Sequence, residues 1–145
     1  MIGHTPRSIE DLDNFYGMRF LVRTGFNVPI VDGKVQSTFR IDRAIPTILY
    51  LIERGARVIL MTHIGRDPEN STKPILEVLN KYVPTTYVDQ VVGERAEGAA
   101  VNMKEGTVLL LENLRSHKGE VANDEAFAET LASYGNFYIN EAFSV

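Results

Sequence analysis

The stretch Val58-Ile59-Leu60-Met61-Thr62-His63 decides the fold class, because a short apolar run passes directly into polar residues. A run of four apolar residues is too short for a helix, and it suits a strand that is buried on both faces of a sheet. Similar runs occupy residues 20–22, 108–111 and 137–139, and residues 85–88 form a weaker one. The sequence therefore predicts a sheet of buried strands.

Segments with helical spacing separate these runs. Four isoleucines recur at steps of four, three and four residues, which places Ile41, Ile45, Ile48 and Ile52 on one face of a helix. Pro46 is expected to bend or weaken this helix, and Gly55 to end it. Three more helices are expected: one capped by Ser71 or Thr72 with Pro74 in its first turn, one through Val92, Ala96, Ala99 and Met103, and one capped by Asn123 with Phe127, Leu131 and Tyr134 facing inward.

Alternation of strands with helices predicts β–α–β crossovers and a mostly parallel sheet covered on both sides. The fold class expected is α/β, with three layers (α/β/α) and a Rossmann-like sheet. A chain of 145 residues suits one domain, and no internal repeat or long linker divides it. We therefore expect residues 1–145 to form a single domain.

Composition narrows the classes of function. With 15 Lys and Arg against 19 Asp and Glu, the net charge of −4 argues against nucleic-acid and anionic-membrane partners. The absence of cysteine excludes disulfides and thiolate chemistry. No apolar signal segment follows the first residues, and the apolar runs fall far short of the ~20 residues of a membrane helix. A cytoplasmic, soluble protein is expected.

Polar residues follow four of the predicted strands. They occupy positions 23–27, 62–66, 112–117 and 140–141. Because ligands bind beyond the carboxyl ends of strands in open parallel sheets, these segments are expected to share one rim. They contain two of the three histidines and several arginines, whose forked donors suit phosphate and carboxylate groups. The pattern favours a small, multiply anionic metabolite as ligand.

Each of these residues also has a purely structural interpretation. Asn27 and Asn113 could hold loop turns through hydrogen bonds from side chain to backbone. Arg40 could be a solvated side chain in the first turn of a helix, and His63 a structural histidine. Neither a G-x-G-x-x-G fingerprint nor a Walker loop is present. Instead, Asp32-Gly33 predicts a hairpin turn.

The polar segments carry motifs that resemble those of phosphoglycerate kinases, in family order and over essentially the whole chain. Arg23-Thr24-Gly25-Phe26-Asn27-Val28-Pro29 is similar to V-R-x-D-F-N-V-P, and residues 38–41 are similar to a T-R-I segment. Residues 58–66 resemble V-I-L-M-S-H-L-G-R, and residues 109–115 match L-L-L-E-N-L-R. Residues 138–143 resemble Y-V-N-D-A-F. Five such matches in order are highly specific.

The resemblance implies a glycolytic enzyme that transfers a phosphoryl group between 1,3-bisphosphoglycerate and ADP, giving 3-phosphoglycerate and ATP. It implies that Arg40 stabilises the transferring group and that His63, Arg66 and Arg115 hold the 3-phosphate end. Asn27 would orient the carboxylate–hydroxyl end. Ile64 and Gly65 would also contact substrate, with Gly65 allowing close backbone approach.

The same resemblance implies a second, C-terminal domain that binds Mg-ATP or Mg-ADP. That domain is expected to be missing from residues 1–145, so this chain would supply the phosphoglycerate site, hold no cofactor or metal, and be inactive alone. The complete enzyme is expected to be monomeric. The sheet edge at residues 137–139 could promote association of the fragment.

Gly25 is the main departure, because the family has Asp there and the aspartate contacts substrate. Loss of such a contact weakens binding by about ten- to a hundredfold. Asp67, Ser116 and Ser144 are further departures from the family pattern. The alternative function is therefore a non-catalytic phosphometabolite-binding or interaction module of the same fold, degenerate at Gly25.

Overall fold

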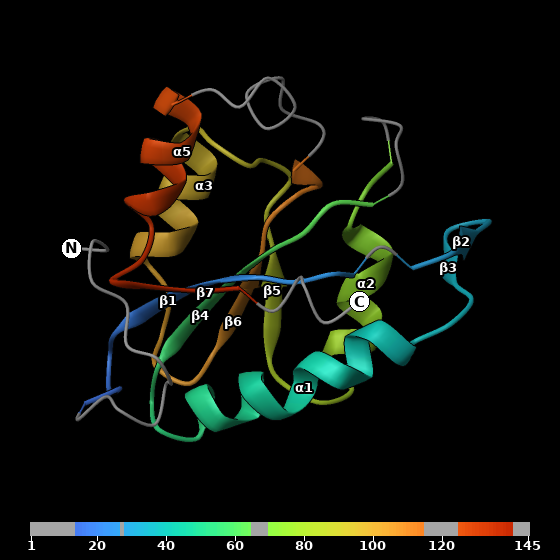
Figure 1. The fold of residues 1–145 in the computed structure, drawn as a ribbon, viewed down its shortest axis with the longest axis horizontal. Coiled ribbons are helices and arrows are strands. Elements are labelled where there is room, and N and C mark those ends of the chain that lie inside the picture. Colours follow the sequence, from blue (N-terminus) through green and yellow to red (C-terminus); the bar gives the residue numbers. More distant parts are fainter. Residues whose placement is uncertain (1–13, 27, 65–69, 115–124, 141–145) are drawn as a thin grey trace.

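A parallel sheet lies at the centre of the computed structural model, which describes residues 14–26, 28–64, 70–114 and 125–140 (Figure 1). Within these ranges the sheet has five strands in the order β5-β6-β4-β1-β7, and every neighbouring pair is parallel. The strands are β1 (Arg19–Arg23), β4 (Arg57–Met61), β5 (Thr85–Tyr87), β6 (Val108–Leu110) and β7 (Phe137–Asn140). All five predicted strands are confirmed, including the weakest.

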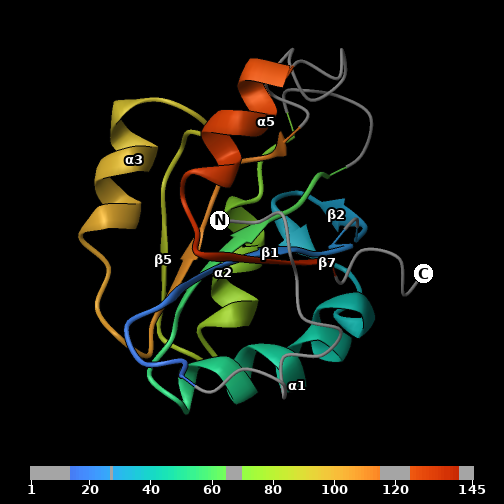
Figure 2. The same ribbon diagram turned by 60° about the vertical axis from the view of Figure 1, so that its left-hand side comes forward.

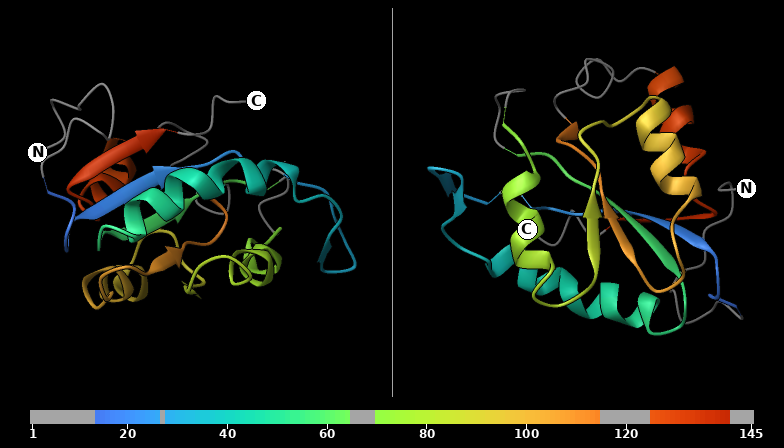
Figure 3. Two further views of the ribbon diagram at one scale, coloured as in Figure 1. Left: turned by 90° about the horizontal axis from the view of Figure 1, so that it is seen from below. Right: turned by 180° about the vertical axis from the view of Figure 1, so that it is seen from behind.

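Helices cover both faces of this sheet (Figures 1 and 2). On one face lie α1 (Phe39–Ile52) and α2 (Lys73–Leu79); on the other lie α3 (Glu94–Val101) and α5 (Glu125–Ala132). Figure 3, in its right-hand view, shows β5 as the outer strand, flanked by α2 and α3. The predicted α/β class with three layers is confirmed.

Alternating strand residues supply the two cores. In β4, Val58 and Leu60 join the core under α1 and α2, whereas Ile59 and Met61 join the core under α3 and α5. Val58, Ile59 and Leu60 have no solvent-accessible surface. A strand buried on both faces needs apolar residues at successive positions, which explains the unbroken apolar runs in the sequence.

Helix α1 presents the predicted isoleucine face to the sheet. Ile41 and Ile48 are fully buried, and Ile45 is 6% exposed. The helix continues through Pro46, whose ring is exposed to solvent. Beyond its end, Gly55 adopts a φ of 82°, a left-handed conformation that suits glycine and turns the chain toward β4.

The ends of the other helices agree in part with the sequence. Thr72 is the N-cap residue of α2 and Pro74 lies in its first turn, as predicted. The third helix is shorter than the predicted pattern at both ends, because it starts after Gly93 and ends at Val101, before Met103. In α5, Phe127 and Leu131 face inward as predicted, whereas the predicted cap Asn123 lies outside the described residues.

The predicted hairpin joins β2 (Ile30–Val31) to β3 (Lys34–Val35). Asp32 and Gly33 both have positive φ, 53° and 74°, which is the pattern of a type I′ turn. The hairpin lies beside α2 (Figure 2). It separates β1 from α1, so the chain leaves the sheet briefly before α1 returns to cover it.

Two kinds of feature are missing from the part of the chain that the structure describes. Its residues include no helix long and apolar enough to cross a membrane. They also include no group of three or more His, Cys, Asp or Glu side chains arranged to hold a metal ion.

Candidate functional site

The carboxyl ends of β1, β4, β6 and β7 lie at one edge of the sheet, which we call the carboxyl rim. The strand register sets Arg23 beside Met61 on one side and beside Asn140 on the other. Leu110 of β6 stands beside Leu60 of β4. The predicted convergence is therefore confirmed for the described parts of the four polar segments.

Thr62 joins the segments that leave β1 and β4. Its fully buried hydroxyl donates a hydrogen bond to the backbone oxygen of Thr24 (3.0 Å) and accepts one from the backbone N–H of Phe26 (3.0 Å). Gly25 lies between these two partners and is half-buried. The Thr62 side chain thus fixes the backbone on both sides of Gly25. Because Thr62 directly precedes His63, this also fixes Gly25 relative to His63.

Asn113 joins the segments that leave β4 and β6. Its Oδ1 atom accepts a hydrogen bond from the backbone N–H of Ile64 (3.0 Å). Its Nδ2 atom donates to the backbone oxygens of Ile64 (3.2 Å) and Asn70 (2.8 Å). Asn113 is fully buried, and these bonds are the side-chain-to-backbone contacts that its structural interpretation predicted.

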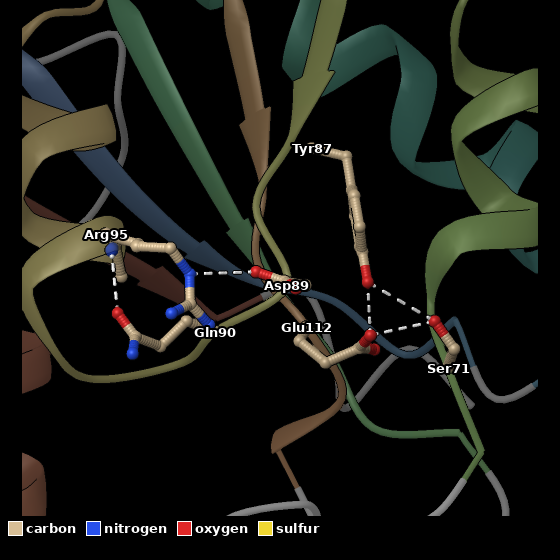
Figure 4. A network of polar contacts seen from close by, with 7 residues as sticks. Ser71, Tyr87, Asp89, Gln90, Arg95 and Glu112 are labelled. Atoms are coloured by element: carbon tan, nitrogen blue, oxygen red, sulfur yellow. Dashed lines mark hydrogen bonds and ion pairs between the residues drawn. The ribbon is translucent and has the colours of Figure 1, made fainter.

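Glu112 lies at the centre of a polar network that Figure 4 shows. Its carboxylate accepts hydrogen bonds from the Ser71 hydroxyl (2.8 Å), the Thr72 backbone N–H (2.7 Å) and the Asn113 backbone N–H (2.7 Å). The Tyr87 hydroxyl, reaching in from β5, is a fourth donor. The network fixes the start of α2 and the side chain of Tyr87 against the end of β6.

The electrostatics of this network follow from burial and hydrogen bonding. Burial alone would raise the pKa of Glu112, but the hydrogen bonds from Tyr87, Thr72, Asn113 and Ser71 outweigh it and hold the pKa below its usual value. Burial, together with the bond to Glu112, raises the pKa of Tyr87 to about 12. At neutral pH the pair is therefore a carboxylate and a neutral phenol.

The start of α2 differs from a simple cap. Ser71 Oγ accepts the hydrogen bond from the backbone N–H of Lys73 (3.0 Å), while the Thr72 hydroxyl donates to the backbone oxygen of Leu111 (2.8 Å). Thr72 thus ties the helix to the β6 strand end instead of capping it. The helix start and the carboxyl rim form one hydrogen-bonded unit.

The structure describes four of the predicted site residues. Ile64 is buried, and His63 is half-buried with its Nδ1 atom shielded from solvent. Gly25 lies between Thr24 and Phe26, whose backbones are hydrogen-bonded to Thr62, the residue before His63. Arg40 lies in the first turn of α1, and its side chain is exposed.

The other four predicted site residues, Asn27, Gly65, Arg66 and Arg115, lie outside the described residues. The sequence pattern also missed a group of residues at the rim. Glu112 was noted only as part of a polar segment, and Tyr87 only as part of a weak strand. No local signal identifies them, because their side-chain contacts with Ser71, with Thr72 and with each other span 16 to 41 positions.

The fold and the rim define a three-layer α/β domain of the class that holds small ligands at the carboxyl edge of a parallel sheet. Residues 9–145 match the model of one protein family, described as phosphoglycerate kinase. The chain therefore belongs to the phosphoglycerate kinase family.

Individual relatives agree with this assignment. The chain is 43% identical to a phosphoglycerate kinase of Methylorubrum extorquens and 45% identical to that of Agrobacterium fabrum. Each match covers 95% of this chain and 36% of the relative. The chain thus spans about a third of the length of these relatives.

A solved structure shows the same fold. Phosphoglycerate kinase from Pyrococcus horikoshii OT3 superimposes with a TM-score of 0.81 at 30% sequence identity. That match covers 94% of this chain and 36% of the other. The similarity therefore extends over nearly all of the 145 residues.

Proposed function

We propose that this chain is the phosphoglycerate-binding, N-terminal domain of a glycolytic phosphoglycerate kinase. The whole protein would transfer a phosphoryl group between 1,3-bisphosphoglycerate and ADP. The observation that carries the proposal is a pair of links at the rim. Thr62, next to His63, bonds to the backbone of Thr24 and Phe26 on either side of Gly25. Asn113 bonds to the backbone of Ile64. Family membership supports it, because the joined segments are those that carry the family motifs.

The proposed roles follow the chemistry of each side chain. His63, Arg66 and Arg115 hold the 3-phosphate end, for which forked and cationic donors are suited. Asn27 orients the carboxylate–hydroxyl end, and the turn at Ile64 and Gly65 brings the backbone close to substrate. The roles of Asn27, Gly65, Arg66 and Arg115 rest on the motif resemblance alone.

Arg40 is the proposed catalytic residue. Phosphoryl transfer depends on positioning and on stabilising negative charge more than on covalent chemistry. Arg40 lies in the first turn of α1 with its side chain exposed, so the guanidinium is accessible to an anion. Arg40 would neutralise charge on the transferring group as the substrate site closes and water is excluded.

Mg-ATP or Mg-ADP would be bound outside residues 1–145, by a nucleotide-binding domain of the whole protein. This proposal agrees with the absence of a Walker loop from the sequence. We further expect the whole enzyme to be monomeric, and the edge strand β7 to be where an isolated 145-residue chain would associate.

One observation favours a second candidate, a non-catalytic module that binds a phosphometabolite or a partner. Gly25 stands at the rim where the family motif has an aspartate, so this position offers no side chain to a ligand. Such a module would keep the fold without the reaction. Retention of the family-motif residues Arg40, His63, Arg66 and Arg115 favours the enzyme.

Calorimetric titration with 3-phosphoglycerate tests the proposal, using the protein at its encoded length and glycerate as the control ligand. The expected result is binding of 3-phosphoglycerate and much weaker binding of glycerate, which lacks the phosphate. A coupled assay should then show ATP-dependent turnover by that protein and none by residues 1–145 alone. Absence of both binding and turnover in the full-length protein would leave the non-catalytic module as the function.

A further inference from the structure

Two adjacent residues at the end of β6 contact both arms of the segment that follows β4. On the outgoing arm, which leaves β4, the Asn113 side chain bonds to both the backbone N–H and the backbone oxygen of Ile64. It binds the returning arm at the backbone oxygen of Asn70. Glu112 binds the next two residues of that arm, the hydroxyl of Ser71 and the backbone N–H of Thr72.

We propose that Glu112 and Asn113 are positioning residues for the phosphoglycerate site: their side chains hold the backbone at Ile64 and at residues 70–72 where substrate binding requires it. Neither residue is assigned to touch substrate. The inference rests on the proposed function, since the segment that they hold contains His63 and Ile64.

The hydrogen-bonding capacity of the two side chains matches this task. Asn113 is fully buried, and its amide uses its oxygen as acceptor and its nitrogen as a donor to two carbonyls. An amide can accept from an N–H through its oxygen and donate to two carbonyls through its nitrogen, whereas a hydroxyl has a single donor. A carboxylate at Glu112 suits its own partners, all of which are donors.

The network also connects the segment to the rest of the sheet. Tyr87 donates to Glu112 from β5, and Leu114 donates its backbone N–H to the Thr62 oxygen (2.9 Å). Ser71 also lies within hydrogen-bond distance of the Tyr87 hydroxyl (3.4 Å), and Thr62 bonds to Thr24 after β1. Displacement of residues 62–64 and 70–72 would therefore break bonds to the ends of β1, β5 and β6 together. Several mutually supporting bonds in a buried site hold a backbone more firmly than any of them alone.

The first test replaces Asn113 by Asp (N113D) in the protein at its encoded length. Aspartate keeps the size and the acceptor for Ile64, but it loses the donors and sets a negative charge against two carbonyl oxygens. The expected result is a rise of about tenfold or more in the Kd and KM for 3-phosphoglycerate. The KM for nucleotide and the kcat at saturating 3-phosphoglycerate should change much less.

Asn80→Asp is the matched control. Asn80 also accepts a backbone hydrogen bond through Oδ1, from Thr85 (2.9 Å), but it lies before β5 at the opposite end of the strands. The substitution adds the same charge and keeps the same acceptor. It should leave the KM for 3-phosphoglycerate unchanged.

Because Asn113 is fully buried, the Asp variant could fail to fold, and Glu112→Gln serves as the second variant. Glutamine keeps one acceptor oxygen for Thr72 and Asn113 and turns an amide toward the hydroxyls of Ser71 and Tyr87, which can reorient. We expect it to fold, to raise the Kd for 3-phosphoglycerate by a smaller factor than N113D, and to speed amide hydrogen exchange in peptides covering residues 62–72.

Two results would overturn the positioning role. One is parent-like affinity for 3-phosphoglycerate in every folded variant. The other is faster hydrogen exchange throughout the chain with the affinity lost only in proportion to global unfolding, which is what a merely structural role gives. Failure of the parent protein to bind 3-phosphoglycerate is a different outcome, and it would overturn the proposed function together with this inference.

Discussion

Arg40 combines an exposed side chain with the proposed role in catalysis, so its replacement should change chemistry far more than stability. In Arg40→Ala we expect kcat to fall by about 10²-fold or more, the usual effect of removing a group that stabilises transition-state charge. The free energy of unfolding should stay within about 0.5 kcal/mol of the parent value. Steady-state kinetics and urea titration measure the two quantities.

Arg43→Ala is the control for this substitution. Arg43 lies one residue beyond Asp42 on the same exposed stretch of α1, with its guanidinium 5.7 Å from the centre of the Phe39 ring. Its removal deletes an equal charge and an exposed cation–π contact, which contributes about 0.5–1 kcal/mol. We expect Arg43→Ala to keep the kcat of the parent protein. If Arg40→Ala also kept it, Arg40 would have no catalytic role.

Gly25 stands where the motif that residues 23–29 resemble has an aspartate. Gly25→Asp restores the family carboxylate, and we expect it to tighten binding of 3-phosphoglycerate by about ten- to a hundredfold. Gly98→Asp is the control: it adds the same charge on α3, where an added Cβ meets no atom within 4 Å. Weaker or unchanged binding in Gly25→Asp would show that the rim does not use a carboxylate there.

The sequence predicted these rim positions well but not the residues that hold them. Polar residues after a buried strand are a local signal, so Gly25, His63 and Ile64 could be located from pattern and motif. For Asn113, the pattern suggested a side-chain-to-backbone contact but not its partners. Those partners, Ile64 and Asn70, lie 49 and 43 positions away, and only the folded chain brings them together.

At the scale of elements, helix α1 contains an internal proline, Pro46, which should lower its stability. Pro46 lacks the N–H that would bond to the carbonyl of Asp42 one turn earlier, and it is exposed. Pro46→Ala restores that donor, and we expect it to raise the free energy of unfolding by about 1–2 kcal/mol. This is less than the ~3 kcal/mol propensity difference, because alanine also gives the unfolded chain more freedom.

Pro74→Ala is the comparison for this prediction. Pro74 lies in the first turn of α2, where backbone N–H groups have no partner within the helix. Its replacement should therefore give no stabilisation. A gain in both variants, or in neither, would mean that the missing hydrogen bond at Pro46 does not limit the stability of α1. Urea titrations of both variants with the parent protein decide between these outcomes.

The elements themselves were predictable to different degrees. Strand positions follow from apolar runs, and the β2–β3 turn follows from Asp32-Gly33, because both signals lie within a few residues. The start of α3 does not follow from its apolar spacing. It depends on the Gln90 side chain, whose oxygen accepts the backbone N–H of Ala96 (3.0 Å) from six residues away. Strand order likewise depends on contacts between distant segments.

At the scale of the whole molecule, the strand order decides what the rim contains. Since β1 lies between β4 and β7, Arg23 has Met61 and Asn140 as its two neighbours across the sheet. Since β6 lies between β4 and β5, its end at Glu112 can meet residues that follow β4 and the Tyr87 hydroxyl of β5. The rim is thus a product of topology, assembled from segments that are distant in sequence.

The Glu112–Tyr87 contact should also give the stability of the molecule a defined pH dependence. The pKa of Glu112 is lower in the folded protein than its usual value of 4.5, so its contribution is present above pH 4.5 and is lost as the pH falls through the folded value. The pKa of Tyr87 is raised from 10.0 to about 12, so its contribution is complete below pH 10 and is lost as the pH rises toward 12.

The free energy of unfolding should therefore fall at both ends of the pH range, along an acid limb and an alkaline limb. Removal of Glu112 should change the acid limb, and removal of Tyr87 the alkaline limb. In Glu112→Gln we expect lower stability at neutral pH and a shallower fall in acid, whereas Tyr87→Phe should make the alkaline fall shallower. The alkaline fall should not vanish, because burial also raises the pKa of Tyr134 and Tyr138. Urea titrations across the pH range measure both limbs.

Glu77→Gln is the control, because it removes an equal charge from an exposed position of α2. It separates the effect of the hydrogen bonds to Glu112 from the effect of the change in net charge. An acid limb as steep in Glu112→Gln as in the parent would mean that the hydrogen bonds to Glu112 do not couple its protonation to folding.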